Sequence, residues 1–201
     1  MSTKPYGLDN VRAEKAATGT EHGECLRDLW LLTRQTEDRH HEVVELADRC
    51  IAYARAGSPC DLDGHSIYPL RKFVNARWTM HSVKEMSGVF AAYVANGFID
   101  VNASLGGTPA LTWAILKANL HTSEHLVLHG ADVAKATGGD DLVDYMDIHY
   151  GFDFAKMPGP QEKAEATARL LAAKMSWDIQ RGVRADAPGA LPGNHLRRLG
   201  I

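Results

Sequence analysis

The sequence predicts an all-α protein in which pairs of helices stack side by side into a solenoid. Apolar residues recur at the i, i+3, i+4 spacing of amphipathic helices along most of the 201 residues. Glycines follow the ends of these segments, and two of them, Gly97 and Gly130, lie 33 residues apart. A fixed period of this length is typical of repeat proteins, in which one helix pair buries its apolar face against the next.

The first elements along the chain are expected to be two pairs of helices. One helix is predicted around Cys25–Thr33 and its partner around Val43–Ala54, because their apolar residues share one face. A stretch rich in Gly and Pro follows. The second pair begins with a helix from about Tyr68 to Trp78. Its partner is opened by Ser82-Val-Lys-Glu85, which has the spacing of a capping box, and it ends at Asn96-Gly97.

The second half of the chain repeats this order. A helix is predicted at Leu111–Ala118, and a partner helix closes at His129-Gly130. The segments after Gly97 and Gly130 are expected to be extended. A further helix stops at Tyr150-Gly151, and Pro160 is well placed as the first residue of a long Ala-rich helix that runs to about Gln180.

These elements predict one continuous stack with two irregular ends. Residues 1–22 are polar and small and are interpreted as an N-terminal arm, and residues 182–201 as a loosely held tail. Between them, residues 23–157 form the predicted repeat stack, and residues 158–181 form a C-terminal helix packed on it.

Composition excludes several functional classes. The chain has a formal net charge of −3, with 45% hydrophobic and 23% charged residues. It therefore lacks the positive field of nucleic-acid-binding proteins, and no DNA or RNA partner is expected. Three cysteines, an odd number, do not make a disulfide framework and favour a reducing compartment. No apolar leader and no stretch of about 18 apolar residues is present, so we expect a cytoplasmic protein without membrane contact.

Two segments of the third repeat resemble the ankyrin repeat family. Gly107-Thr-Pro-Ala-Leu-Thr-Trp-Ala-Ile115 is similar to the Thr-Pro-Leu-His-x-Ala signature with one inserted residue, and His129-Gly-Ala-Asp-Val133 resembles the end of the repeat. Tyr68-Pro-Leu70 stands where Thr-Pro-Leu would stand one repeat earlier. The resemblance is clearest over residues 68–133, and it implies an ankyrin-like solenoid of about four helix-turn-helix repeats with short extended fingers.

The resemblance also implies a non-catalytic function in protein binding. Ankyrin repeats contact partner proteins through their fingers and the exposed side of their inner helices. Carried onto this sequence, the partner-binding residues of the fingers are Asp61, Asp63, His65, Ser104, Leu105, Asp140 and Asp141. Those of the inner helices are Arg71, Asn75, Trp78, Thr112, Lys117 and Asn119. The aspartates favour a partner with a basic surface, and such a protein would act as an inhibitor, an immunity factor or a regulatory adaptor.

Two tryptophans are interpreted separately. Trp113 occupies a packing position of the repeat and is expected in the core. Trp78 lies near an insertion, and the sequence leaves open whether it is a core residue or an anchor for a partner.

A competing prediction is a metal-dependent hydrolase or metal sensor that uses His121 and His125. These residues and His129 are spaced by four, which aligns them on one helix face and offers two nitrogens to a metal. However, no Cys or carboxylate ligand set accompanies them, and Thr122-Ser123 are interpreted as a helix cap between the first two histidines. We therefore expect no metal, no cofactor and no catalytic residue.

The remaining motifs are near misses. His41-Glu-Val-Val-Glu45 has Glu in place of the second His of a zinc-protease motif. Cys50, Cys60 and His65 lack the paired Cys-x-x-Cys unit of a zinc site, and no phosphate-binding Gly-rich loop is found. A structural subunit of a larger assembly remains a third hypothesis, and the sequence leaves the oligomeric state open.

Overall fold

The computed structural model describes residues 20–33, 39–61, 68–76, 78, 82–152 and 158–185. Over these residues the protein is helical apart from one two-stranded sheet, which confirms the all-α class. Residues 1–19 of the predicted arm and residues 186–201 of the predicted tail lie outside this part of the chain. The last two residues assigned to the arm already belong to a helix, which begins at Glu21.

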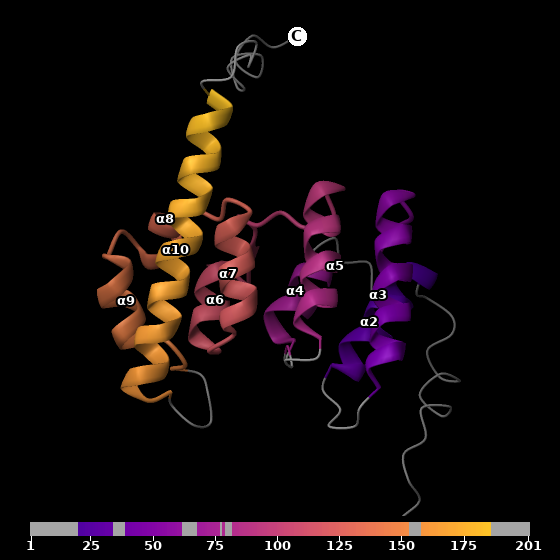
Figure 1. Cartoon of the computed structure of the whole chain (residues 1–201), viewed down its shortest axis with the longest axis horizontal. Coiled ribbons are helices and arrows are strands. Elements are labelled where there is room, and N and C mark those ends of the chain that lie inside the picture. Colours follow the sequence, from indigo (N-terminus) through magenta and orange to yellow (C-terminus); the bar gives the residue numbers. More distant parts are fainter. Residues whose placement is uncertain are drawn as a thin grey trace, which may run out of the picture.

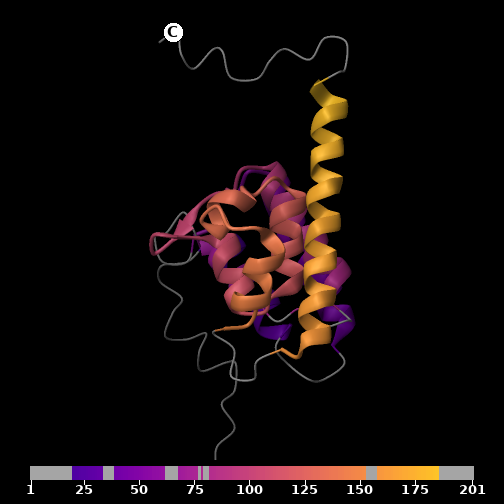
Figure 2. The same ribbon diagram turned by 90° about the vertical axis from the view of Figure 1, so that its left-hand side faces the viewer.

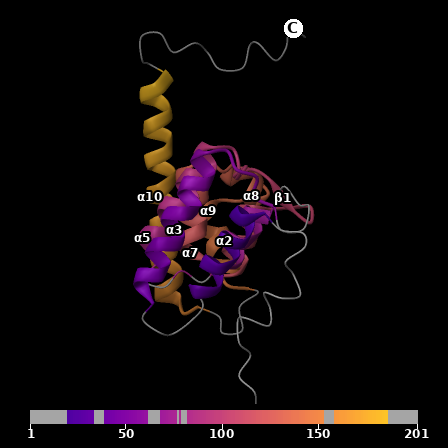
Figure 3. The ribbon, with the colours of Figure 1, turned by 90° about the vertical axis from the view of Figure 1, so that its right-hand side faces the viewer.

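The helices form two rows that run in the order of the sequence (Figure 1). The inner row consists of α2 (Glu21–Leu32), α4 (Tyr68–Asn75), α6 (Ala110–Leu116) and α9 (Leu142–His149). The outer row consists of α3 (His40–Arg55), α5 (Val83–Ala95), α7 (Leu120–Leu128) and α10 (Pro160–Ala185). Each helix packs against the next one in its row, and α2–α3, α6–α7 and α9–α10 also pack across the rows. Seen from the α2–α3 end, the successive pairs lie behind one another (Figure 3).

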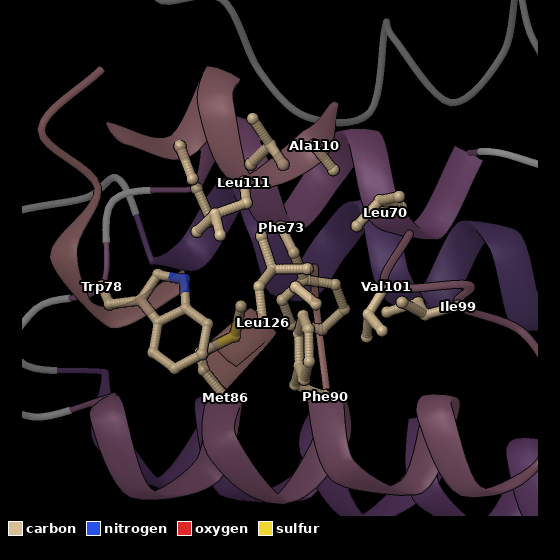
Figure 4. Packing of buried hydrophobic residues seen from close by; sticks show 14 of the residues in the cluster. Leu70, Phe73, Trp78, Met86, Phe90, Ile99, Val101, Ala110, Leu111 and Leu126 are labelled. Atoms are coloured by element: carbon tan, nitrogen blue, oxygen red, sulfur yellow. The ribbon is translucent and has the colours of Figure 1, made fainter. Parts of the chain in front are cut away.

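One hydrophobic core runs through the rows from Cys25 to Ala173. Phe73 of α4 lies at its centre and meets the rings of Phe90 and Tyr93 of α5 edge-on, with centroids 5.1 and 6.0 Å apart. Trp78, from the segment between α4 and α5, and Leu126 of α7 belong to the same buried cluster (Figure 4). Edge-to-face contacts of this kind add to the free energy gained by burying the rings, so this cluster joins the second helix pair to the third.

The outer helices α3, α5 and α7 end in the same way. Each is followed by a glycine in the left-handed region, Gly57, Gly97 or Gly130, with φ of +66°, +76° and +92°. The next amide N–H then bonds back to the carbonyl five residues earlier, at 2.9 to 3.0 Å. This is the Schellman arrangement, which satisfies carbonyls that a helix end leaves without partners. The glycine positions identified in the sequence therefore mark true helix ends.

A short hairpin projects between the second and third helix pairs. Its strands are β1 (Ser104–Leu105) and β2 (Thr108–Pro109), paired antiparallel through a Gly106-Gly107 turn. Both glycines have positive φ, as two-residue hairpin turns require. Trp113 Nε1 donates to the Leu105 carbonyl at 2.9 Å and holds the hairpin against α6. Trp113 is half-buried at this position rather than fully enclosed in the core.

The segment after Gly130 is helical, which corrects the expectation of a second extended finger. Residues Val133–Thr137 form α8, because the Asp132 side chain accepts the N–H of Lys135 and caps the first turn. Gly138 then ends this helix with a φ of +68°. The predicted finger residues Asp140 and Asp141 therefore lie in the turn that leads from α8 to α9.

Three predicted helix starts differ in detail. Ser82 is the N-cap of α5 but makes no capping bond with its side chain, so the expected capping box does not form. The helix predicted from Leu111 begins one residue earlier, at Ala110, directly after Pro109, which still pairs in β2. Asn119, not the expected Thr122-Ser123 pair, caps α7, and it does so by accepting the N–H of Thr122.

The last outer helix, α10, begins at Pro160 as expected and extends to Ala185. It packs on α7 and α9 through buried Ala166, Leu170 and Ala173. Its C-terminal part continues past the other helices (Figure 2). Among the described helices, none has a stretch long and apolar enough to cross a bilayer.

Candidate functional site

Of the predicted finger residues that the structure describes, three are exposed. Ser104 lies on the hairpin, and Asp140 and Asp141 lie at the start of α9. Asp141 also caps α9, because its carboxylate accepts the N–H of Val143 at 2.8 Å. Leu105 is half-buried in the hairpin.

The first predicted finger is described at one residue only. Asp61 is half-buried, and its backbone exchanges hydrogen bonds with Thr20, whose N–H donates to the Asp61 carbonyl at 2.9 Å. Asp63 and His65 lie outside the described residues.

Among the predicted inner-helix residues, Arg71 and Asn75 are exposed on α4. The Asn75 amide donates to the Arg71 carbonyl at 2.8 Å. Lys117 is half-buried, and its ammonium lies 5.6 Å from the centre of the Trp113 ring. These three side chains retain exposed surface that a partner could reach.

The other three inner-helix residues make contacts within the fold, which corrects the prediction that they face a partner. Thr112 is buried and donates its hydroxyl to the Ala136 carbonyl at 2.7 Å. Trp78 is 9% exposed, so the core interpretation of this residue is the one that the structure supports. The Asn119 amide donates at 2.9 to 3.1 Å to the carbonyls of Phe73, Val74 and Ala76. Polar residues at loop and helix ends can serve the fold in this way, and spacing alone cannot distinguish the two roles.

His121 and His125 of α7 and its C-cap residue His129 lie along one face, and Trp78 covers the first two. The Trp78 ring stacks on His121 and His125, with centroids 5.8 and 5.3 Å apart. His125 in turn stacks on His129 at 6.2 Å. The row is therefore part of the packing between the second and third helix pairs.

His125 is held as a neutral ring. Burial lowers its pKa to about 4, and the neighbouring His129 adds to this effect. Ser87 donates its hydroxyl to the Val83 carbonyl at 2.6 Å, so its oxygen accepts from His125 Nε2 at 2.8 Å. Because the Ser87 proton points away from the ring, this pair does not have the arrangement of an activated serine nucleophile. His125 Nδ1 is buried with no partner among the described residues.

His121 lies beside an ion pair. Arg169 of α10 bonds to Glu124 and also approaches His121 Nδ1 at 3.4 Å. Burial lowers the pKa of His121, and the Arg169 charge lowers it further. Within the described ranges, no three His, Cys, Asp or Glu side chains lie close enough together to hold a metal ion.

The most distinctive surface lies on the last helix pair. All six large hydrophobic side chains that are exposed in the described part of the chain belong to α9, α10 and the turn after α9. Their exposed fractions range from 37% to 66%, and they are Val143, Ile148, Phe152, Leu171, Met175 and Ile179. We call these six residues and the exposed Asp140, Asp141, Asp144 and Asp147 the terminal surface.

On α9, apolar and acidic side chains share one exposed arc. At 100° per residue, the order around the helix is Val143, Asp147, Asp144 and Ile148. All four are exposed, while Leu142 and Met146 on the opposite side are buried. The arc is thus a carboxylate-bearing strip with an apolar side chain at each edge.

On α10, the exposed apolar residues form a second stripe. Leu171, Met175 and Ile179 follow one another at i, i+4 spacing, on the side of the helix opposite to buried Leu170 and Ala173. A helix that is apolar on two sides has more apolar surface than its own stack covers. The sequence contains this signal, because two offset apolar stripes are present in residues 166–179.

Comparisons with known proteins add no relative. No family model, no curated protein and no solved structure matches this chain.

Proposed function

We propose that this chain is a non-catalytic protein-binding protein of ankyrin-like repeats and that the terminal surface contacts its partner. The repeat interpretation is supported by helix pairs that stack in sequence order, by the hairpin before α6 and by the shared glycine ends of α3, α5 and α7. A stack of this kind offers rigid faces for recognition.

The single observation that carries the binding function is the concentration of exposed apolar side chains on α9 and α10. Repeat stacks usually end in a polar outer face, because an apolar end associates with other molecules. Here the last pair is the most apolar exposed part of the described chain. We infer that a partner covers it.

The charges around this surface favour a partner with basic groups. Four aspartates border Val143 and Ile148, and each is exposed. A protein segment that presents lysines or arginines beside apolar side chains, such as a basic amphipathic helix, matches both features. By covering such a segment, the protein would act as an inhibitor, an immunity factor or a regulatory adaptor.

Affinity capture from source lysate tests this proposal when charge-reversed variants are compared. Asp140→Lys with Asp144→Lys, which leaves the Asp141 cap of α9 in place, is expected to reduce recovery of the partner at least tenfold, and added salt should weaken wild-type capture, because exposed charges are screened. The control is Glu45→Lys with Asp48→Lys on exposed positions of α3, which makes the same change in net charge.

Two outcomes would contradict the proposal. One is equal capture by the terminal-surface variant and wild type. The other is that no protein is captured specifically while the wild-type chain has the mass of a dimer in solution. If Ile148→Asn and Met175→Asn then gave the mass of a monomer, the terminal surface would bind a second copy of the chain.

A further inference from the structure

A pair of buried thiols lies at the opposite end of the stack from the terminal surface. Cys25 of α2 and Cys50 of α3 face each other with their sulfur atoms 3.3 Å apart, and the Cys50 thiol donates to Cys25. The two side chains are 3% and 0% exposed. A disulfide has its sulfurs about 2.05 Å apart, so a small approach of two helices that already pack together would join them.

The two cysteines have different electrostatic roles. The hydrogen bond from Cys50 lowers the pKa of Cys25, and the positive charge of Arg49 adds to this effect against the opposing influence of burial. The pKa of Cys50 is raised, because its proton is held in that hydrogen bond and the side chain is buried. Cys25 is therefore the thiol that ionises first, and Cys50 is placed to attack it afterwards.

We propose that Cys25 and Cys50 form a peroxide-responsive disulfide that joins α2 to α3. The Cys25 thiolate attacks one oxygen of hydrogen peroxide, so that an S–O bond forms, the O–O bond breaks and the released hydroxide takes up a proton to become water. The Cys50 sulfur then attacks the Cys25 sulfenic acid, so that the S–S bond forms, the S–O bond breaks and a second water leaves with the Cys50 proton. Two thiols are oxidised and one peroxide is reduced to two waters.

Access to the pair depends on the place of α2 in the stack. As the first inner helix, α2 packs on α3 and α4 and lacks a neighbour on its other side among the described helices. End elements of a stack open locally at a lower free-energy cost than central ones. A molecule as small as hydrogen peroxide can reach Cys25 during such opening.

The third cysteine, Cys60, is an internal reference for the reactivity of Cys25 toward peroxide. Cys60 is half-buried, and burial raises its pKa to about 12. It is thus a protonated thiol at neutral pH, and thiols react with peroxide far more slowly than thiolates. Cys60 is more exposed than Cys25 but less ionised. If ionisation controls the reaction with peroxide, Cys25 reacts first, and if exposure alone controls it, Cys60 reacts first.

The experiment treats the full chain with hydrogen peroxide and measures its intact mass without reductant. We expect the loss of two hydrogens, one Cys25–Cys50 cross-linked peptide after digestion, free Cys60 and full reversal by a phosphine reductant. The oxidised protein should also unfold at a temperature higher by on the order of 10 °C, because the bond closes a loop between residues 25 positions apart.

Variants separate the two steps. Cys60→Ser should still form the disulfide, whereas Cys50→Ser should stop at a Cys25 sulfenic acid that dimedone traps. A cross-link through Cys60, or oxygen addition to the wild-type chain without any cross-link, would overturn the proposal. The wild-type mass and peptide map decide the question even if Cys50→Ser fails to fold.

Discussion

At the scale of single residues, Gly130 meets two requirements at once. Its φ of +92° lies where side chains cause strain, and a Cβ atom built there would come within 2.5 Å of the Trp177 ring of α10. Gly97 has a similar conformation, with a φ of +76°, but the space around it is open. The two glycines end equivalent helices and differ only in what packs over them.

We expect Gly130→Ala to destabilise the protein by about 2–4 kcal/mol, because it adds a clash with Trp177 to the cost of positive φ. Gly97→Ala, the matched control, should cost about 1 kcal/mol, since it carries only the conformational cost. Denaturant unfolding followed by circular dichroism measures both values. Equal losses would mean that Trp177 does not rest on Gly130.

Both glycines were predictable as helix ends, because the left-handed cap leaves a clear mark in sequence. The contact with Trp177 was not. Helical periodicity identifies which side of a helix is apolar but not which of its neighbours that side covers, and Trp177 is 47 positions away from Gly130.

At the scale of elements, the junction of α6 and α7 is tied to α4 by one side chain. Asn119 caps α7 with its carbonyl oxygen and donates its amide to three carbonyls around the end of α4. Thr122 adds a further bond to the Phe73 carbonyl at 2.9 Å. The second and third helix pairs are thus joined by polar contacts as well as by the core.

Asn119→Ala is expected to cost about 2–3 kcal/mol, because it removes a helix cap and leaves buried carbonyls without a donor. Asn96→Ala makes the same substitution at the end of α5, where the exposed amide donates to the Ala92 carbonyl at 2.8 Å. That control should cost less than about 1 kcal/mol. Thermal unfolding of both variants gives the comparison, and a smaller loss for Asn119→Ala than for Asn96→Ala would refute the role given to Asn119.

The apolar spacing predicted the helix pairs correctly, but the predicted roles of three inner-helix residues were wrong. Asn119, Thr112 and Trp78 were predicted to face a partner, and all three have structural contacts instead. The apolar period decides where helices form, whereas the orientation of one polar side chain depends on acceptors that distant segments bring to it. The exposed apolar stripes of the terminal surface were not predicted, because apolar residues at helical spacing indicate a buried face and carry no mark that distinguishes an exposed one.

At the scale of the whole molecule, stacking encloses four histidines of the described ranges that lie up to 107 positions apart in the sequence: His22 is buried, and the other three are half-buried. Burial lowers the pKa of each of them: His22, His121, His125 and His129. His22 of α2 connects the segment after α3 to α5. It donates to the Ser58 carbonyl at 2.8 Å and accepts from the Tyr93 hydroxyl of α5 at 2.5 Å. The folded stack therefore takes up fewer protons than the unfolded chain in mildly acidic solution.

Stability should fall as the pH is lowered from about 6.5 towards 4. The unfolded histidines protonate first, near 6.5, and favour the unfolded state until the folded pKa of about 4 is reached for His125. The contribution of His125 alone is at most about 3 kcal/mol. At about pH 7.5 and above both states are nearly neutral at these residues, so this contribution to the pH dependence is absent there.

Unfolding by urea at several pH values measures this effect. His125→Gln should reduce the slope of stability against pH between 4 and 6.5. An unchanged slope for His125→Gln would contradict the assignment of a depressed pKa to that residue.

The Gly106-Gly107 hairpin has a consequence for engineering. Its tip is exposed, a Cβ at either glycine would meet open space, and its base is fixed by Trp113 and by the pairing of Ser104 with Pro109. A peptide inserted between the two glycines would begin and end at the fixed tip of the hairpin and would not cross the core. The hairpin is thus a natural graft position, where a fluorophore-bearing or epitope peptide could be carried by the stack without disturbing either row of helices.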